Sequence, residues 1–172
     1  MITTKHTMVA LVEDKPGVLN RIASMFRRRG FNISSLAVGH SEMQGLSRMT
    51  FVVDGDDTTV EQVTKQLYKL IDVVRVTDLS NEEIVTREMA LVKVRAAAQI
   101  RGEIIQVVDI FRANIVDVSP DTLIIEVTGD EDKIQSLLEM LKPFGVREVM
   151  RTGRIAMIRG GTAAQEGESG RP

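Results

Sequence analysis

Residues 13–22, EDKPGVLNRI, decide the fold of the first part of this chain. The run that leads into them, HTMVALVE (6–13), has the composition of a β-strand. A proline–glycine pair then interrupts the chain, and apolar residues resume with the i, i+3, i+4, i+7 spacing of one helix face. Those residues are Val18, Leu19, Ile22, Met25 and Phe26. The stretch therefore predicts a strand, a short loop and an amphipathic helix.

The elements that follow complete a βαββαβ unit. Gly30 ends the first helix, as glycine commonly does. A strand hairpin is then predicted in residues 31–41 and 46–55, a second helix in residues 56–71 and a fourth strand in residues 72–80. In the second helix, Thr58 followed by Glu61 matches a capping box.

The same order of elements recurs in the second half of the chain. A strand is predicted in residues 86–96, a helix in 100–113 and a hairpin in 114–119 and 122–129. A second helix in 130–145 and a strand in 146–153 follow, and residues 154–160 add a strand-like segment. Right-handed crossovers place both helices of such a unit on one face of a four-stranded antiparallel sheet. The predicted fold class is therefore α+β, with two tandem ferredoxin-like βαββαβ domains.

These patterns also predict the domain boundaries. We expect an N-terminal domain in residues 1–79, a linker in 80–86 and a C-terminal domain in 87–160. A disordered tail of small and polar residues is expected in 161–172. Because the helices cover one face of each sheet, the other face is bare in a single unit. We expect a partner to cover it.

The composition is that of a globular protein, with 172 residues of which 43% are hydrophobic. A net charge of -2 with interleaved signs provides no basic surface for nucleic acid. The chain has no cysteine, which excludes disulfides and thiolate chemistry and suits a reducing compartment. No stretch has the length and apolarity of a signal peptide or a membrane span. We therefore expect a cytoplasmic protein that contacts neither nucleic acid nor membrane.

The sequence contains no recognisable catalytic or metal-binding motif. The acidic stretch DGDD (54–57) lacks the spacing of a calcium loop and reads as a turn before a helix N-cap. His6 and His40 belong to no metal-ligand grouping. Few aromatic residues argue against an RNA-binding sheet, and Glu13 and Asp14 would repel a phosphate from the first strand–helix loop. We expect binding rather than bond making, with no catalytic residue and no metal site.

The loop between the first strand and the first helix is the best candidate for a binding site. Pro16 fixes the backbone before the helix, and Gly17 lets a ligand approach the main chain. The N–H groups of Gly17, Val18 and Leu19 then offer an anion site at the positive helix end. Asp14 offers an acceptor for an ammonium group. Together these groups suit a free aliphatic α-amino acid, and an ordinary strand–helix turn is the alternative.

Several segments resemble a known family. The stretch EDKPGVLNRIASMF resembles the signature of ACT domains, which are amino-acid-sensing ferredoxin-like modules. The wider pattern resembles the small regulatory subunit of acetohydroxyacid synthase, also called acetolactate synthase, over nearly all of residues 5–160. The segments are RRRGFNISSLAVG (27–39), GLSRMTFVV (45–53), QLYKLIDVVRV (66–76), REMALVKV (87–94), IFRANIVDVS (110–119) and RTGRIAMIRG (151–160).

The resemblance implies a regulatory role. Small subunits of this family are not catalytic alone. They activate a thiamine-diphosphate-dependent large subunit in branched-chain amino-acid synthesis and confer feedback inhibition by valine, or by leucine or isoleucine in some members. The resemblance also implies that thiamine diphosphate, magnesium and FAD belong to the large subunit, and that this chain holds no cofactor.

The resemblance further implies where the effector binds. Family members form homodimers through their N-terminal ACT domains, with valine between the strand–helix loop of one chain and the start of the second strand of the other. The matching positions are Asp14, Gly17, Val18, Leu19 and Asn20 on one side, and Asn32 and Ile33 on the other. The C-terminal domain of the family contributes to the large-subunit contact, and its own loop here, QIRGEI, lacks the proline–glycine pair.

Two other functions stay open beside this one. A free-standing ACT sensor would serve a different client, such as a transcription factor or another biosynthetic enzyme. A passive dimerisation module would bind no small molecule. The first predicts no stimulation of an acetolactate synthase large subunit, and the second predicts no thermal shift with any amino acid.

Overall fold

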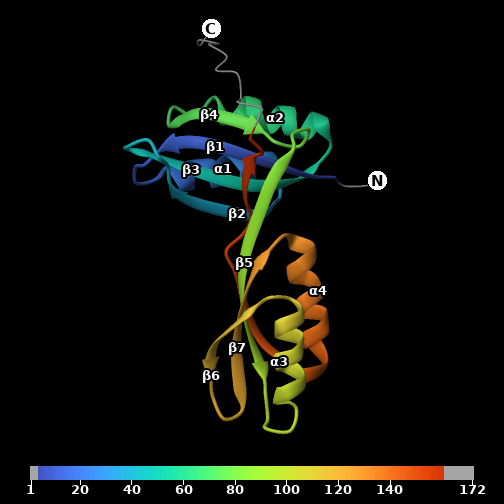
Figure 1. Ribbon diagram of the computed structural model, residues 1–172. Helices are drawn as coiled ribbons and strands as arrows, with labels where there is room; N and C mark the ends of the chain where they lie inside the picture. Colours follow the sequence, from blue (N-terminus) through green and yellow to red (C-terminus); the bar gives the residue numbers. More distant parts are fainter. Residues whose placement is uncertain (1–3, 161–172) are drawn as a thin grey trace. The chain divides into compact units, whose positions relative to one another are not determined.

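The computed structural model describes residues 4–160, which form two compact units (Figure 1). The first unit is built from residues up to Val85 together with the chain from Ala156 onward, and the second from Thr86–Ile155. Each unit has its own sheet and its own hydrophobic core. The predicted α+β class with two ferredoxin-like βαββαβ units is confirmed.

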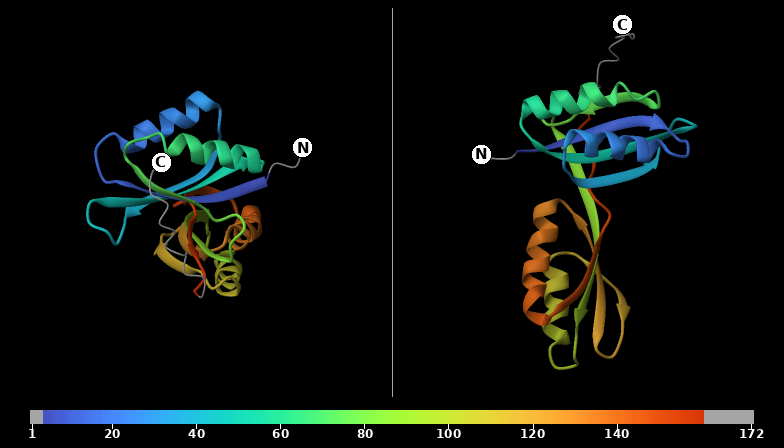
Figure 2. Two further views of the ribbon diagram at one scale, coloured as in Figure 1. Left: turned by 90° about the horizontal axis from the view of Figure 1, so that it is seen from above. Right: turned by 180° about the vertical axis from the view of Figure 1, so that it is seen from behind.

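The first unit follows the predicted order of elements. They are β1 (Thr4–Glu13), α1 (Val18–Arg29), β2 (Ile33–His40), β3 (Leu46–Gly55), α2 (Asp57–Leu67) and β4 (Val73–Asp78). The strands pair antiparallel in the order β2-β3-β1-β4, so β2 and β4 are the two edges of this four-strand path. Both helices lie on the same face of the sheet (Figure 2).

The core of the first unit lies between that sheet face and the helices. Alternate residues of β1 face the helices, with Met8 opposite Phe51 and Ala10 opposite Met49. The rings of Phe26 and Phe51 meet edge to face with centroids 5.5 Å apart. Of the predicted apolar stripe on α1, Val18, Ile22, Met25 and Phe26 are buried, whereas Leu19 is 48% exposed. The packed stripe is narrower than the sequence pattern indicated, and Leu19 lies at its margin.

Helix α2 is capped by a residue other than the predicted one. Asp56 accepts hydrogen bonds from the backbone N–H of Thr59 at 2.8 Å and from its hydroxyl at 2.7 Å. The capping box predicted from Thr58 and Glu61 is wrong, because the helix already begins at Asp57 and Glu61 pairs with Lys65. The expectation that the acidic stretch 54–57 leads into a helix N-cap is confirmed.

The second unit repeats the arrangement. Its elements are β5 (Ile84–Arg95), α3 (Arg101–Ile110), β6 (Asn114–Val118), β7 (Thr122–Gly129), α4 (Glu131–Leu141), a 3₁₀ turn (Lys142–Phe144) and β8 (Val146–Arg151). The strand order is β6-β7-β5-β8. Ile104, Ile125 and Leu137 are among its fully buried side chains. Across β5 and β8, Arg151 donates to both carboxylate oxygens of Glu88 at 2.7 Å, and this bond raises the pKa of Arg151.

A last strand, β9 (Ile155–Ile158), returns to the first unit and pairs with β5. Ala156 packs with Val9 and Leu79 on the helix-free side of the first sheet. The observed units therefore differ from the expected boundaries at two places: β5 begins within the expected linker 80–86, and the end of the expected domain 87–160 packs on the first unit. The expected tail, 161–172, lies outside the described residues.

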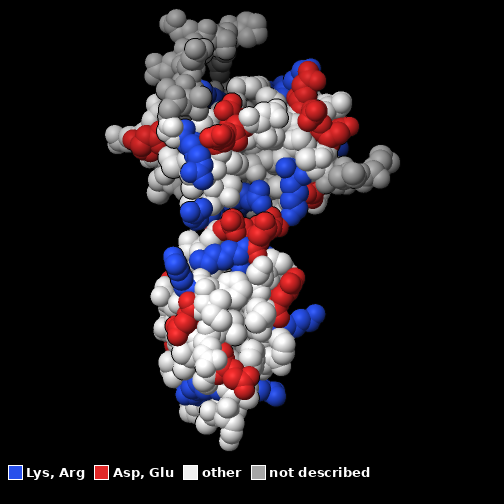
Figure 3. Space-filling model, turned by 45° about the vertical axis from the view of Figure 1, so that its right-hand side comes forward, with Lys and Arg blue, Asp and Glu red and all other residues white. Residues whose placement is uncertain are grey.

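Charged side chains of both signs are interleaved over the visible face of the molecule, with uncharged areas between them (Figure 3). No helix within residues 4–160 is long and apolar enough to cross a membrane.

Candidate effector site

The loop that joins β1 to α1 is held in place by two neighbouring turns. The backbone N–H of Glu13 donates to the carbonyl of Asp72 at 2.9 Å, and that of Asp14 donates to the carbonyl of Gly45 at 2.9 Å. The loop thus leaves the sheet at a fixed point, beside the β2–β3 turn and the α2–β4 connection. Pro16 lies directly before the N-cap residue of α1, as predicted.

Gly17 is the N-cap residue of α1 and has a positive φ of 88°. A Cβ atom added there would meet no heavy atom within 4 Å, so the space beside the main chain is open. No side chain caps the helix, and no acidic residue lies in its first turn. The N–H of Val18 makes a long turn bond of 3.4 Å to the carbonyl of Lys15. This helix end can therefore accept an anion from outside.

Asp14 has a neighbour that the sequence did not indicate. Its carboxylate oxygen lies 3.1 Å from Nδ1 of His40, and both side chains are exposed to solvent. His40 ends β2, and β1 and β2 run parallel because each is antiparallel to β3. The ends of β1 and β2 therefore meet at the same edge of the sheet. That topology was the only signal that could have linked the two residues.

Arg21 and Asp72 form a second unpredicted contact beneath the loop. The Nε atom of Arg21 lies 2.8 Å from one carboxylate oxygen of Asp72, and Nη2 donates to the other at 3.2 Å. The Asp72 side chain is only 6% exposed. The pair ties the first turn of α1 to the α2–β4 connection, and so stabilises the position of the helix end that carries Gly17.

The other predicted positions lie at the opposite end of α1. Asn32 precedes β2 and donates from Nδ2 to the carboxylate of Asp54 at 2.8 Å. Ile33 opens β2 and packs against the core. Since α1 has 12 residues, it separates the two groups by about 18 Å along its axis.

One chain therefore does not bring all seven predicted residues together. Asp14, Gly17, Val18, Leu19 and Asn20 gather at the start of α1, while Asn32 and Ile33 lie beyond its end. Within the first group, Leu19 and Asn20 are exposed, whereas the side chain of Val18 is buried in the core and leaves only its main chain to a ligand. A site that uses both groups needs two chains.

The described residues hold no cluster of three or more histidine or acidic side chains that would suit a metal ion. His6, the other histidine, is buried with Nδ1 3.0 Å from the Ser80 hydroxyl.

Comparison with known proteins identifies the protein family that each half of the chain matches. Residues 8–75 match a family model described as an AHAS small subunit-like ACT domain. The first unit is thus an ACT domain, with its loop at the position described above. Residues 87–160 match a second model, described as the small subunit of acetolactate synthase.

Several named proteins match the sequence of this chain over nearly its whole length. A probable acetolactate synthase small subunit from Archaeoglobus fulgidus is 56% identical over 156 residues, covering 91% of this chain and 98% of that protein. An acetolactate synthase small subunit from Mycobacterium bovis is 52% identical over 155 residues, covering 90% of this chain and 92% of that protein. The crystal structure of the acetolactate synthase small subunit from Thermotoga maritima superposes with a TM-score of 0.85 at 49% identity, covering 91% and 98%. The chain belongs to the acetolactate synthase small subunit family.

Proposed function

We propose that this chain is a non-catalytic regulatory subunit that activates the catalytic large subunit of an acetolactate synthase and makes it sensitive to a branched-chain amino acid. Thiamine diphosphate, magnesium and FAD would be held by that large subunit, in the cytoplasm. Family membership supports the partnership with a catalytic subunit. The feature of the structure that carries the regulatory part of the proposal is the open helix end at Gly17.

The chemistry of that helix end suits the main-chain groups of an α-amino acid. Unused partial positive charge at the start of α1 favours a carboxylate. Asp14 lies beside it with an exposed carboxylate that can accept from an ammonium group. The exposed side chain of Leu19 offers apolar surface next to the same loop. Burying an isopropyl group of valine would contribute about 1.5–3 kcal/mol.

The free edge of the first sheet supports a homodimer that completes the site. β2 is an edge strand, and Leu36 and Val38 on it are 36% and 51% exposed. If β2 pairs antiparallel with β2 of a second copy, the partner's strand start lies alongside this chain's strand end at His40. Because His40 contacts Asp14, such pairing carries Asn32 and Ile33 of the second copy toward the β1–α1 loop.

This arrangement suggests how the effector acts. A ligand held between two chains stabilises whichever dimer conformation brings the two parts of the site together. If that conformation activates the large subunit less well, effector binding inhibits the enzyme. Allosteric couplings of about 1–3 kcal/mol are typical, which is enough for graded inhibition.

The first experiment measures acetolactate formation by the catalytic subunit from the same source. Activity is compared with and without the full chain, and the mixture is titrated with valine, leucine and isoleucine. We expect stimulation by the chain and reversal of that stimulation by at least one of the three amino acids. Absence of stimulation, with an active catalytic subunit and a folded chain, would leave an amino-acid sensor for another client or a passive dimer.

A variant pair locates the effector site. Gly17→Asp places a carboxylate where the ligand's own carboxylate is expected, so inhibition should be lost while stimulation remains. Gly145→Asp is the matched control, since Gly145 has a comparable positive φ of 95° but lies in the second unit. Inhibition that survives Gly17→Asp would show that the effector binds elsewhere.

A further inference from the structure

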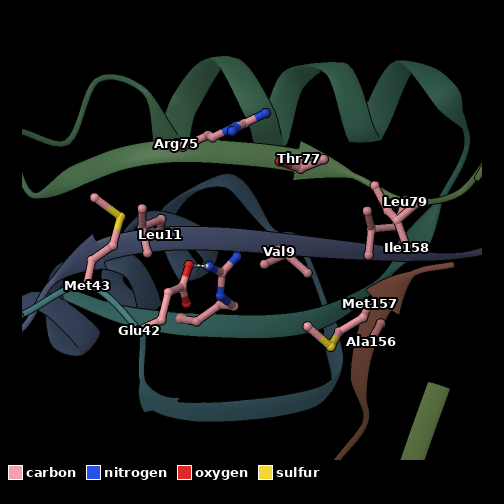
Figure 4. Close-up of a pocket in the computed structure, with 11 residues that line it drawn as sticks. Val9, Leu11, Glu42, Met43, Arg75, Thr77, Leu79, Ala156, Met157 and Ile158 are labelled. Atoms are coloured by element: carbon pink, nitrogen blue, oxygen red, sulfur yellow. Dashed lines mark hydrogen bonds and ion pairs between the residues drawn. The ribbon is translucent and has the colours of Figure 1, made fainter. Parts of the chain in front are cut away.

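The helix-free face of the first sheet contains a cavity that is separate from the effector loop. Its volume is about 330 Å³, which lies within the range of small-molecule sites. Its floor is formed by Val9 and Leu11 of β1, and one wall is the returning strand β9 with Ala156, Met157 and Ile158 (Figure 4). All of these residues belong to the first unit.

The charges around the cavity are unbalanced. Glu42 lies on its lower side (Figure 4) and pairs with Arg48, another lining residue, at 2.6 Å, so each largely neutralises the other. Hydrogen bonds from the Glu42 backbone N–H and from Arg48 hold the pKa of Glu42 below its usual value. Arg75 lies on the opposite side, on β4, and has no acidic partner among residues 4–160. One guanidinium therefore remains available to a ligand.

The strand register aligns this cation with the apolar floor. Arg75 lies directly opposite Leu11, and Thr77 lies directly opposite Val9. Residues paired in this way share one sheet face with side chains a few ångströms apart. A polar row on edge strand β4 thus runs beside an apolar row on β1. A ligand with an anionic head and an aliphatic body matches both rows at once.

We propose that this cavity binds a small aliphatic carboxylate that carries no ammonium group. The guanidinium of Arg75 can hold a carboxylate through two parallel hydrogen bonds, and the Thr77 hydroxyl can donate to the same head group. The aliphatic body then covers Val9 and Leu11 and contacts β9. An α-amino acid is disfavoured here because Glu42, the one carboxylate that lines the cavity among residues 4–160, is already paired with Arg48. The proposal does not depend on the effector site or on the catalytic partner.

Two methionines allow the binding to be observed directly. Met43 and Met157 line the cavity and are 52% and 76% exposed. In the full chain labelled with ¹³C at the methionine methyl groups, sodium hexanoate should shift their signals in a saturable way. Met25 in the first core and Met140 on α4 serve as internal references and should not move.

The head group is tested with probes of the same chain length. Hexanoate should bind about tenfold more tightly than hexanol, because a hydrogen bond to a charged group adds that much affinity. Leucine, which carries an ammonium group, should leave Met157 unchanged; Met43 is not used for this comparison because its turn contacts the effector loop. Equal affinity for hexanoate and hexanol, or a saturable shift of Met157 with leucine, would overturn the assignment.

The variant Arg75→Met tests the cation while keeping a long side chain. It should weaken hexanoate binding about tenfold and leave hexanol binding unchanged. Arg28→Met is the control, since Arg28 is an exposed arginine on α1. The proposal fails if hexanoate produces no shift at Met43 and Met157, or if Arg75→Met binds hexanoate like the original chain. Gly17→Asp should retain hexanoate binding in full, which separates this result from the test of the effector site.

Discussion

At the residue scale, Gly17 determines both the backbone conformation of the loop and the open space beside its main chain. Its positive φ is costly for residues with a side chain, and the absence of a Cβ keeps the helix end accessible. The sequence showed that glycine follows proline at this junction. The sign of φ, which decides what a substitution costs, comes only from the structure.

Replacement of Gly17 by alanine should therefore destabilise the first unit by about 1 kcal/mol, although no atom obstructs the new methyl group. Gly102→Ala is the matched control. Gly102 lies inside α3 without a positive φ and also faces open space, so alanine there should stabilise the protein by about 0.5–1 kcal/mol. Urea unfolding of the full chain measures both free energies. If both substitutions lower the free energy of unfolding, or both raise it, this contradicts the argument from backbone conformation.

The residues that surround the loop could be predicted only in part. Pro16, Gly17 and Asp14 are adjacent in sequence, so their shared location follows from the local pattern. The contacts of Asp14 with His40 and of Arg21 with Asp72 join positions 26 and 51 residues apart. Such pairs depend on strand order and register, which a single sequence leaves open.

At the element scale, the cap of α2 illustrates how closely spaced signals compete. The stretch 56–61 offers Asp56 and Thr58 as N-cap residues, and both types are favoured at that position. Asp56 is the cap in the structure, with two hydrogen bonds to Thr59. The order of strands and helices was predictable from periodicity. The exact cap, the early start of β5 and the return of β9 were not, because tertiary contacts determine them.

The cap predicts a pH dependence. Hydrogen bonds from the Thr59 side chain and backbone lower the pKa of Asp56. Its ionised form thus stabilises the fold above the unfolded-state pKa, and this contribution is lost as the pH falls through the lower folded-state pKa. We expect Asp56→Asn to be less stable than the original chain at pH 7 and to approach it near pH 3. Urea unfolding at both pH values measures the difference, and a difference independent of pH would contradict the role of the charge.

At the scale of the whole molecule, the free edge at β2 is the feature with the widest consequence. An edge strand with exposed apolar side chains is a template for pairing with another chain. The second sheet has a comparable edge at β6, where Val116 is 52% exposed. The two edges allow a direct comparison.

If the chain forms the homodimer proposed above, a charge on β2 should weaken self-association. Val38→Lys should raise the dimer dissociation constant at least about tenfold, which corresponds to about 1.4 kcal/mol. Val116→Lys is the matched control, with the same substitution at an edge residue of nearly equal exposure. Sedimentation equilibrium measures both. If Val116→Lys disrupts the dimer and Val38→Lys does not, the second unit rather than the ACT domain carries the interface.

The return of β9 also constrains the order in which the protein can mature during synthesis. Domains generally fold as they leave the ribosome, with the N-terminal one first. Here Ala156 and Ile158, which pack against Val9 and Leu79, are made only after the entire second unit. A nascent chain that ends before residue 155 carries a first unit whose helix-free face still lacks its cover. The first unit to begin folding is therefore the last to be completed.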